Sequence, residues 1–173
     1  MTTYRLRSAL RTAGLALVLP AGGVCLAGCA GPVNAAGSWS LNLTNGANEC
    51  MVMDWTPGQM TTGVPVSIVQ SGSTVTADVT GAYGTVLDLY YGTHRFTCTV
   101  AADHIEMSLV GRAGAMGTCA YTPDLTLDGT ISGDTITGTV AWSFDTNSSA
   151  ECGAYATCAN VQAMNGSRPP TSP

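Results

Sequence analysis

The stretch DTITGTVAWSF, residues 134–144, alternates between two kinds of side chain at every second position. Apolar or small residues occupy one set of positions, namely Ile136, Gly138, Val140, Trp142 and Phe144. Thr, Ala and Ser fill the positions between them. Because successive side chains of a β-strand point to opposite faces, this period predicts a strand with one buried face and one wet face.

The same alternation recurs in STVTADV at 73–79, HIEMSL at 104–109 and LTLDGTI at 125–131. The side chains expected to face inward in these stretches are Val75, Ala77, Val79, Ile105, Met107, Leu109, Leu125, Leu127 and Ile131. No long stretch shows the period of an amphipathic helix. We therefore expect an all-β protein with about nine or ten antiparallel strands of ordinary length.

Three Gly-x pairs lie between runs of this kind, at Gly72-Ser73, Gly92-Thr93 and Gly133-Asp134. A glycine at the first central position fits a two-residue type II′ turn, because that position needs a positive φ. Each pair is therefore predicted to join two strands in a hairpin.

A sheet with this many strands and one apolar face is expected to close into a barrel, which removes its edges. Gly37-Ser38-Trp39, where the first strand begins, resembles the Gly-x-Trp with which calycins (lipocalins and fatty-acid-binding proteins) open their barrels. The resemblance implies an antiparallel up-and-down barrel of about 8–10 strands. It also implies that Trp39 plugs one end of the barrel beneath a late arginine, here Arg168.

The N-terminal residues have the features of an export signal. Arg5, Arg7 and Arg11 precede an apolar stretch at 13–26, which is shorter than the roughly 20 residues that span a bilayer and is interrupted by Pro20. This pattern predicts a segment that is removed after export, and not a membrane anchor.

Leu26-Ala27-Gly28-Cys29 resembles the lipobox of bacterial lipoproteins. The resemblance implies that the sulfur of Cys29 receives a diacylglycerol and that a signal peptidase cuts before it, so that Cys25 is lost. An ordinary secretory cleavage near Ala35-Ala36 is the alternative. The predicted parts are a signal peptide at 1–28, a lipidated tether at 29–36, a β-barrel domain at 37–166 and a flexible tail at 167–173.

The residue after Cys29 is Ala30, whereas an aspartate there often retains lipoproteins at the inner membrane. The resemblance therefore points to the cell envelope of a bacterium, at the outer membrane in preference to the inner one. The protein is expected to meet the membrane through this lipid, because two or three acyl chains anchor a protein durably.

From Cys29 onward the chain has three arginines and no lysine against eleven acidic residues, a net charge of −8. Nucleic acid is therefore an unsuitable partner, since phosphate binding needs clustered Lys and Arg. The charge also gives the domain no attraction to an anionic membrane surface, which leaves anchoring to the lipid.

Five cysteines follow Cys29, and disulfides are expected because an exported chain meets oxidising conditions. If the last strand pairs with the first, Cys50 lies near Cys158, or near Cys152 just before it. We favour Cys50–Cys158, with the tight pair Cys152–Cys158 as an open alternative. Cys98 and Cys119 are expected to form a second bridge, which leaves one of the five, Cys152 in this scheme, free.

Candidate chemistry is sparse. Met51 and Met53 follow Cys50 in a Met-x-Met pattern that suits Cu(I), but shared packing on one strand face is the favoured interpretation, and no metal or other cofactor is expected. His104 and Glu106 are expected on a solvated strand face. The chain has no Gly-x-Ser-x-Gly, Ser-His-Asp order, phosphate loop or Cys-x-x-Cys, so we expect no enzyme.

These features predict a non-enzymatic, lipid-anchored envelope protein that holds a small apolar ligand in its barrel, or is another envelope component. The alternative is a lipid-anchored inhibitor of an attacking hydrolase, a lysozyme or a protease, because an acidic surface suits a basic target. A third hypothesis is a periplasmic Cu(I) binder. An open apolar cavity favours the carrier, and a filled interior favours the inhibitor.

Lipidation is tested in a bacterial host that processes lipoproteins. Mass spectrometry should find a diacylglyceryl group on Cys29 as the first residue of the mature chain. Cys29→Ser should move the protein from the membrane fraction to the soluble fraction, because the acyl chains are its anchor. An unmodified mature N-terminus near Gly37 contradicts this assignment.

Overall fold

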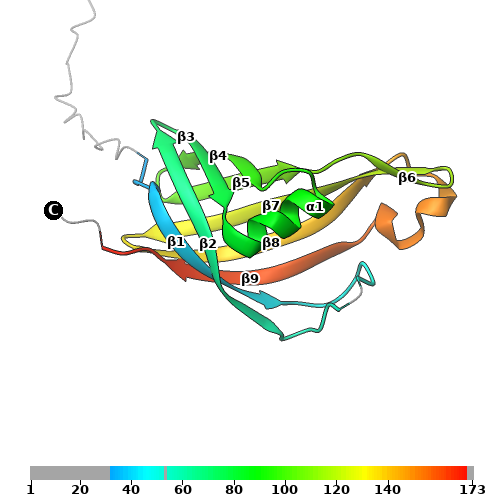
Figure 1. Cartoon of the computed structure of the whole chain (residues 1–173), viewed down its shortest axis with the longest axis horizontal. Helices are drawn as coiled ribbons and strands as arrows, with labels where there is room; N and C mark the ends of the chain where they lie inside the picture. The colour runs from blue at the N-terminus through cyan, green and yellow to red at the C-terminus, as the bar shows by residue number, and fades with distance from the viewer. Residues whose placement is uncertain (1–31, 53, 171–173) are drawn as a thin grey trace, which may run out of the picture.

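Eight antiparallel strands close into a barrel in the computed structural model, which describes residues 32–52 and 54–170 (Figure 1). The ring consists of β1 (Gly37–Asn45), β2 (Met60–Ser71), β3 (Thr74–Val79), β4 (Arg95–Ala101), β5 (His104–Val110), β7 (Cys119–Ser132), β8 (Thr135–Thr146) and β9 (Ala159–Ser167). A short strand β6 (Gly114–Met116), a helix α1 (Gly81–Tyr90) and a 3₁₀ segment η1 (Ala150–Ala156) complete the described elements.

Each strand of the ring pairs with its neighbours in the chain, and two pairings complete the circle. β1 pairs with β9 from Ser40 opposite Ser167 to Asn45 opposite Gln162. β5 pairs with β7, so β6 is not part of the ring. β6 pairs only with the start of β7. The expected fold, an all-β antiparallel up-and-down barrel, is thus confirmed.

The alternation of side chains along the strands determines which residues face the interior of the barrel. Every residue expected to face inward in the 73–79, 104–109 and 125–131 stretches is buried. Ile136 and Val140 of β8 are buried too, while Trp142 is partly buried and packs against this core. The interleaved Thr and Ser residues remain on the wet face, because the strand period is two.

The two ends of the barrel differ in how the strands are connected. At one end, which we call the turn end, two-residue turns join β2 to β3, β4 to β5 and β7 to β8. At the other, the loop end, lie residues 46–52 and 54–59, α1, β6 and η1. Both the start of β1 and the end of β9 reach the turn end, on the left of Figure 1.

Two of the three predicted Gly-x hairpins are confirmed. Gly72 and Gly133 have φ values of +63° and +59°, and each follows directly on the end of a strand. The third prediction is wrong: Gly92, with φ of +81°, ends α1, and its N–H donates to the carbonyl of Asp88. A hairpin turn and a helix end both favour glycine, because both need a left-handed backbone, which glycine alone adopts without strain.

Ala102 occupies the equivalent position in the β4–β5 turn and was not identified from the sequence. Its φ is +54°, in the region where an L side chain is strained. The turn comprises Ala102 and Asp103, between the paired residues Ala101 and His104. A turn without glycine carries no sequence signal of the kind used above, which is why it was missed.

The two turns give a matched pair of substitutions. Gly133→Ala should lower the free energy of unfolding by about 1–2 kcal/mol, because a Cβ there meets no neighbour within 4 Å and only the backbone conformation is strained. Ala102→Gly should raise it by about 0.5–1 kcal/mol, since the strain is removed. Urea denaturation measures both, and changes of the same sign in the two variants contradict this turn geometry.

Candidate functional site

The turn end of the barrel is sealed by Trp39 and Arg168, the pair expected from the sequence. Trp39 is 2% exposed, and the guanidinium carbon of Arg168 lies 4.9 Å from the centre of its ring. The Arg168 Nε donates to Asp134 at 2.9 Å, and another guanidinium nitrogen donates to the carbonyl of Ala36 at 2.6 Å. The buried cation is therefore paired and hydrogen-bonded, as burial of a charge requires.

Residues before β1 complete this seal. Val33 donates its backbone N–H to the carbonyl of Ala102, and Ala35 donates to the side-chain oxygen of Gln70. Ala35 is fully buried, and its carbonyl accepts the indole N–H of Trp39 at 2.9 Å. Residues 33–36, assigned to the tether in the sequence analysis, thus cross the turn end and contact the strands on its rim.

Inside the barrel lies a cavity of about 340 Å³. Its walls are mostly aliphatic and aromatic, with Trp39 at the sealed end and residues such as Leu41, Val66, Leu127, Val140 and Trp142 along the sides. The lining also includes Asp54, Gln59, Tyr83 and Val86, all exposed residues at the loop end. The cavity therefore reaches the surface at the loop end, and its size lies within the range of small-molecule sites.

A chain of hydrogen bonds crosses the wall of the cavity near this mouth. The indole N–H of Trp142 donates to the side-chain oxygen of Gln162 at 2.9 Å, and Gln162 donates to the side-chain oxygen of Asn45 at 2.8 Å. Gln162 is only 6% exposed and lines the cavity. Trp55 and Tyr91 lie edge-on to Trp142, with ring centres 6.2 and 5.9 Å away.

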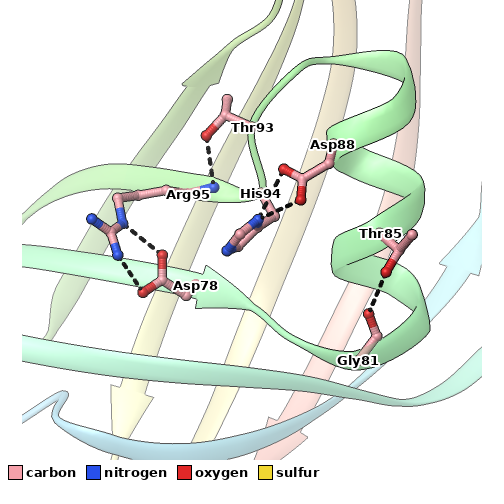
Figure 2. A network of polar contacts seen from close by, with 7 residues as sticks. All are labelled: Asp78, Gly81, Thr85, Asp88, Thr93, His94 and Arg95. Carbon is pink, nitrogen blue, oxygen red and sulfur yellow. Dashed lines mark hydrogen bonds and ion pairs between the residues drawn. The ribbon is translucent and has the colours of Figure 1, made fainter.

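Helix α1 forms one side of the mouth, to which it contributes Leu87. The helix approaches β3 so closely that a Cβ at Gly84 would collide with the carbonyl oxygen of Val79. On its outer side, Figure 2 shows His94 directed at the carboxylate of Asp88, with Nδ1 at 2.9 Å from Oδ1. This contact links the helix to the segment that leads into β4.

An ion pair, to the left of the helix in Figure 2, joins β3 to β4. Arg95 makes two hydrogen bonds to Asp78, at 2.7 and 2.9 Å. The hydrogen bond from Arg95 is the main cause that lowers the pKa of Asp78, and partial desolvation opposes it. Because the pair is largely exposed, its contribution to stability is modest, and it is lost as pH falls through that lowered pKa.

Two disulfides brace the loop end. Cys50 is bonded to Cys158, the favoured pair, with Cα atoms 5.0 Å apart. The second prediction is wrong: Cys119 is bonded to Cys152, and not to Cys98. Cys119 begins β7 and Cys152 lies in η1, so both belong to the loop end, whereas Cys98 lies within β4. Cys152 is accordingly not the free thiol.

Cys98 is the free cysteine of the described ranges, and it is buried inside the barrel wall. Its thiol donates to the carbonyl of Val75 at 3.0 Å. Burial raises the pKa of the thiol to about 11, because the charged thiolate is poorly solvated there. Cys98 is thus a packed core residue of low reactivity.

The other candidate residues lie apart from the cavity. Met51 is 72% exposed in the loop before β2, so it lies on no strand face, and its neighbour Cys50 is consumed in a disulfide. Met53 lies outside the described residues, as does Cys29. His104 lies on the exposed face of β5, with Nε2 3.4 Å from Asp128. Within residues 32–52 and 54–170, no three His, Cys, Asp or Glu side chains gather into a metal site.

The mouth of the cavity was not predicted from the sequence. Gln162 and Asn45 alternate with outward residues on β9 and β1, and a polar side chain at an inward position was the available signal. The helix was missed because Gly81 and Gly84 weaken its pattern. Neither α1 nor η1 is long and apolar enough to cross a membrane, in the described part of the chain.

Comparison of the chain with protein-family models, with curated proteins and with solved structures found no match.

The burial of Cys98 predicts slow alkylation. At pH 8 a pKa near 11 leaves about 100-fold less thiolate than the ordinary value of 9.0, so iodoacetamide should label native Cys98 at least about 100-fold more slowly than the unfolded chain. The rate should rise with pH up to that pKa. Peptide mapping follows Cys98 separately from the other cysteines, and rapid native labelling contradicts this packing.

Proposed function

We propose that the protein is a non-enzymatic, lipid-anchored component of a bacterial envelope that binds a small apolar ligand inside its barrel. The observation that carries this proposal is the apolar cavity of about 340 Å³, sealed by Trp39 and open at the loop end. Burial of apolar surface in such a cavity supplies binding energy without directional contacts.

The resemblance to calycins supports the same function. The Gly-x-Trp motif predicted that Trp39 would lie beneath a late arginine, and Arg168 does lie over Trp39. Calycin barrels commonly enclose small molecules, and an eight-stranded barrel whose side chains leave space can hold one such ligand. The two disulfides suit an exported protein, because they persist in oxidising compartments.

Lipidation at Cys29 would also orient the cavity. Val33 is hydrogen-bonded to the β4–β5 turn at the sealed end, and it lies four positions after Cys29. Four residue-to-residue steps reach at most about 14 Å, so the sealed end would face the anchoring membrane. The mouth would then open away from that membrane, towards the aqueous compartment from which a ligand arrives.

The inhibitor hypothesis depends on the outer surface and not on the cavity. A protein that acts only through its surface gains nothing from an unfilled interior, since every void forfeits packing contacts. The cavity therefore favours the carrier over the inhibitor. The Cu(I) hypothesis is weakened, because Cys50 is bonded to Cys158 and therefore offers no thiolate ligand.

Binding is tested with n-butylbenzene, an uncharged hydrocarbon of suitable size. Because the three tryptophans of the chain all line the cavity, their fluorescence should change saturably on titration. Val140→Phe, which fills the cavity from β8, should weaken binding at least about tenfold. Thr139→Phe places the same ring on the exposed face of β8 and should leave binding unchanged.

Calorimetry with the same ligand and variants provides the check that does not depend on fluorescence. Saturable binding that Val140→Phe weakens and Thr139→Phe spares supports the carrier. Absence of saturable binding in the unmodified protein contradicts it, as does equal weakening in both variants.

A further inference from the structure

The hydrogen bonds at the mouth of the cavity have a fixed direction. An indole N–H is a donor only, so Trp142 requires the oxygen of the Gln162 amide to face it. The NH₂ group of Gln162 must then face Asn45, which accepts with its own oxygen. One donor-only group thereby sets the orientation of both amides.

This direction leaves donors at the end of the chain of hydrogen bonds. The oxygen of Asn45 is taken by Gln162, and its NH₂ group donates to no acceptor in the part of the chain that the structure describes. Asn45 is partly buried and lines the cavity. A ligand at the mouth therefore meets an amide donor, and it is best received by a group that accepts a hydrogen bond.

The charges around the cavity disfavour an anion. No Lys, Arg or His occurs among the lining residues of the described chain. Arg95 and Arg168 are already paired with Asp78 and Asp134, and Arg112 packs beside Gly92 at the loop end without lining the cavity. Among the lining residues that the structure describes, only Asp54, a carboxylate at the mouth, is charged. A carboxylate on a ligand at the mouth would thus lose part of its hydration, face the negative charge of Asp54 and gain no cation.

We propose that the cavity selects uncharged apolar molecules that carry one hydrogen-bond acceptor, such as an ester or ketone oxygen, and rejects the corresponding carboxylates. The acceptor meets Asn45 at the mouth, and the apolar part extends towards Trp39. The cavity volume of about 340 Å³ lies near the lower end of the range of small-molecule sites, which favours a small ligand. This selectivity rests on the proposed carrier function.

The test uses three ligands that share a phenyl group and ten carbon atoms. Methyl 3-phenylpropanoate is an uncharged ester, 4-phenylbutanoate is the anion that its isomeric acid forms at neutral pH, and n-butylbenzene has no acceptor. Tryptophan fluorescence and calorimetry should show the ester binding about tenfold more tightly than butylbenzene, and at least about 100-fold more tightly than the anion. Acidification below the pKa of the ligand's carboxyl group should restore binding of the acid.

Asn45→Asp tests the donor directly. The carboxylate still accepts from Gln162 but replaces the NH₂ donor with an oxygen, so the preference for the ester over butylbenzene should fall from about tenfold to about twofold. Asn42→Asp adds the same charge on the outer face of β1, where Asn42 contacts Asn165, and should keep the full preference.

Each outcome decides one of the two proposals. If none of the three ligands binds, the carrier function itself is wrong. If butylbenzene binds while the carboxylate binds as tightly as the ester, the carrier stands and the selectivity is overturned. An ester preference that Asn45→Asp leaves intact also overturns it. The ligand series in the unmodified protein gives this answer even where a variant fails to fold.

Discussion

The pairing of β1 with β9 is the contact on which the rest of the structure depends. It joins the two ends of the described chain in one ladder and turns an open sheet into a ring. Both ends of this seam are fastened: Arg168 lies over Trp39 at the turn end, and Cys50 is bonded to Cys158 at the loop end. Because the disulfide closes a loop of about 100 residues, its contribution through the entropy of the unfolded chain is about 4–5 kcal/mol.

The difference between the two ends of the barrel follows from this arrangement. Tight turns leave little chain at the turn end, and residues 33–36 with Arg168 fill what remains. The loop end carries the long connections, which the disulfides, Trp55 and α1 hold around an opening without filling the barrel. A cavity with one sealed end and one polar rim is the consequence, and the proposed binding of a ligand uses both features.

The sequence predicted those parts of the fold that depend on local periodicity. Strand alternation located the inward residues, and Gly72 and Gly133 located two turns. The Cys50–Cys158 pair followed from the closure of the ring. The Cys119–Cys152 pair did not, because it depends on where β6 and η1 lie at the loop end, which no local pattern encodes. Neither could the hydrogen bonds of Gln162 be predicted, since they join β1, β8 and β9.

The central claim is that the barrel interior is an accessible apolar cavity with a polar mouth. A crystal structure of the protein soaked with methyl 3-(4-bromophenyl)propanoate tests it most directly, because anomalous scattering locates the bromine without reference to the protein coordinates. The account predicts a bromine peak inside the barrel on the side of Trp39, with the ester carbonyl at Asn45. Bromine found only on the outer surface, or an interior filled by side chains, would contradict it.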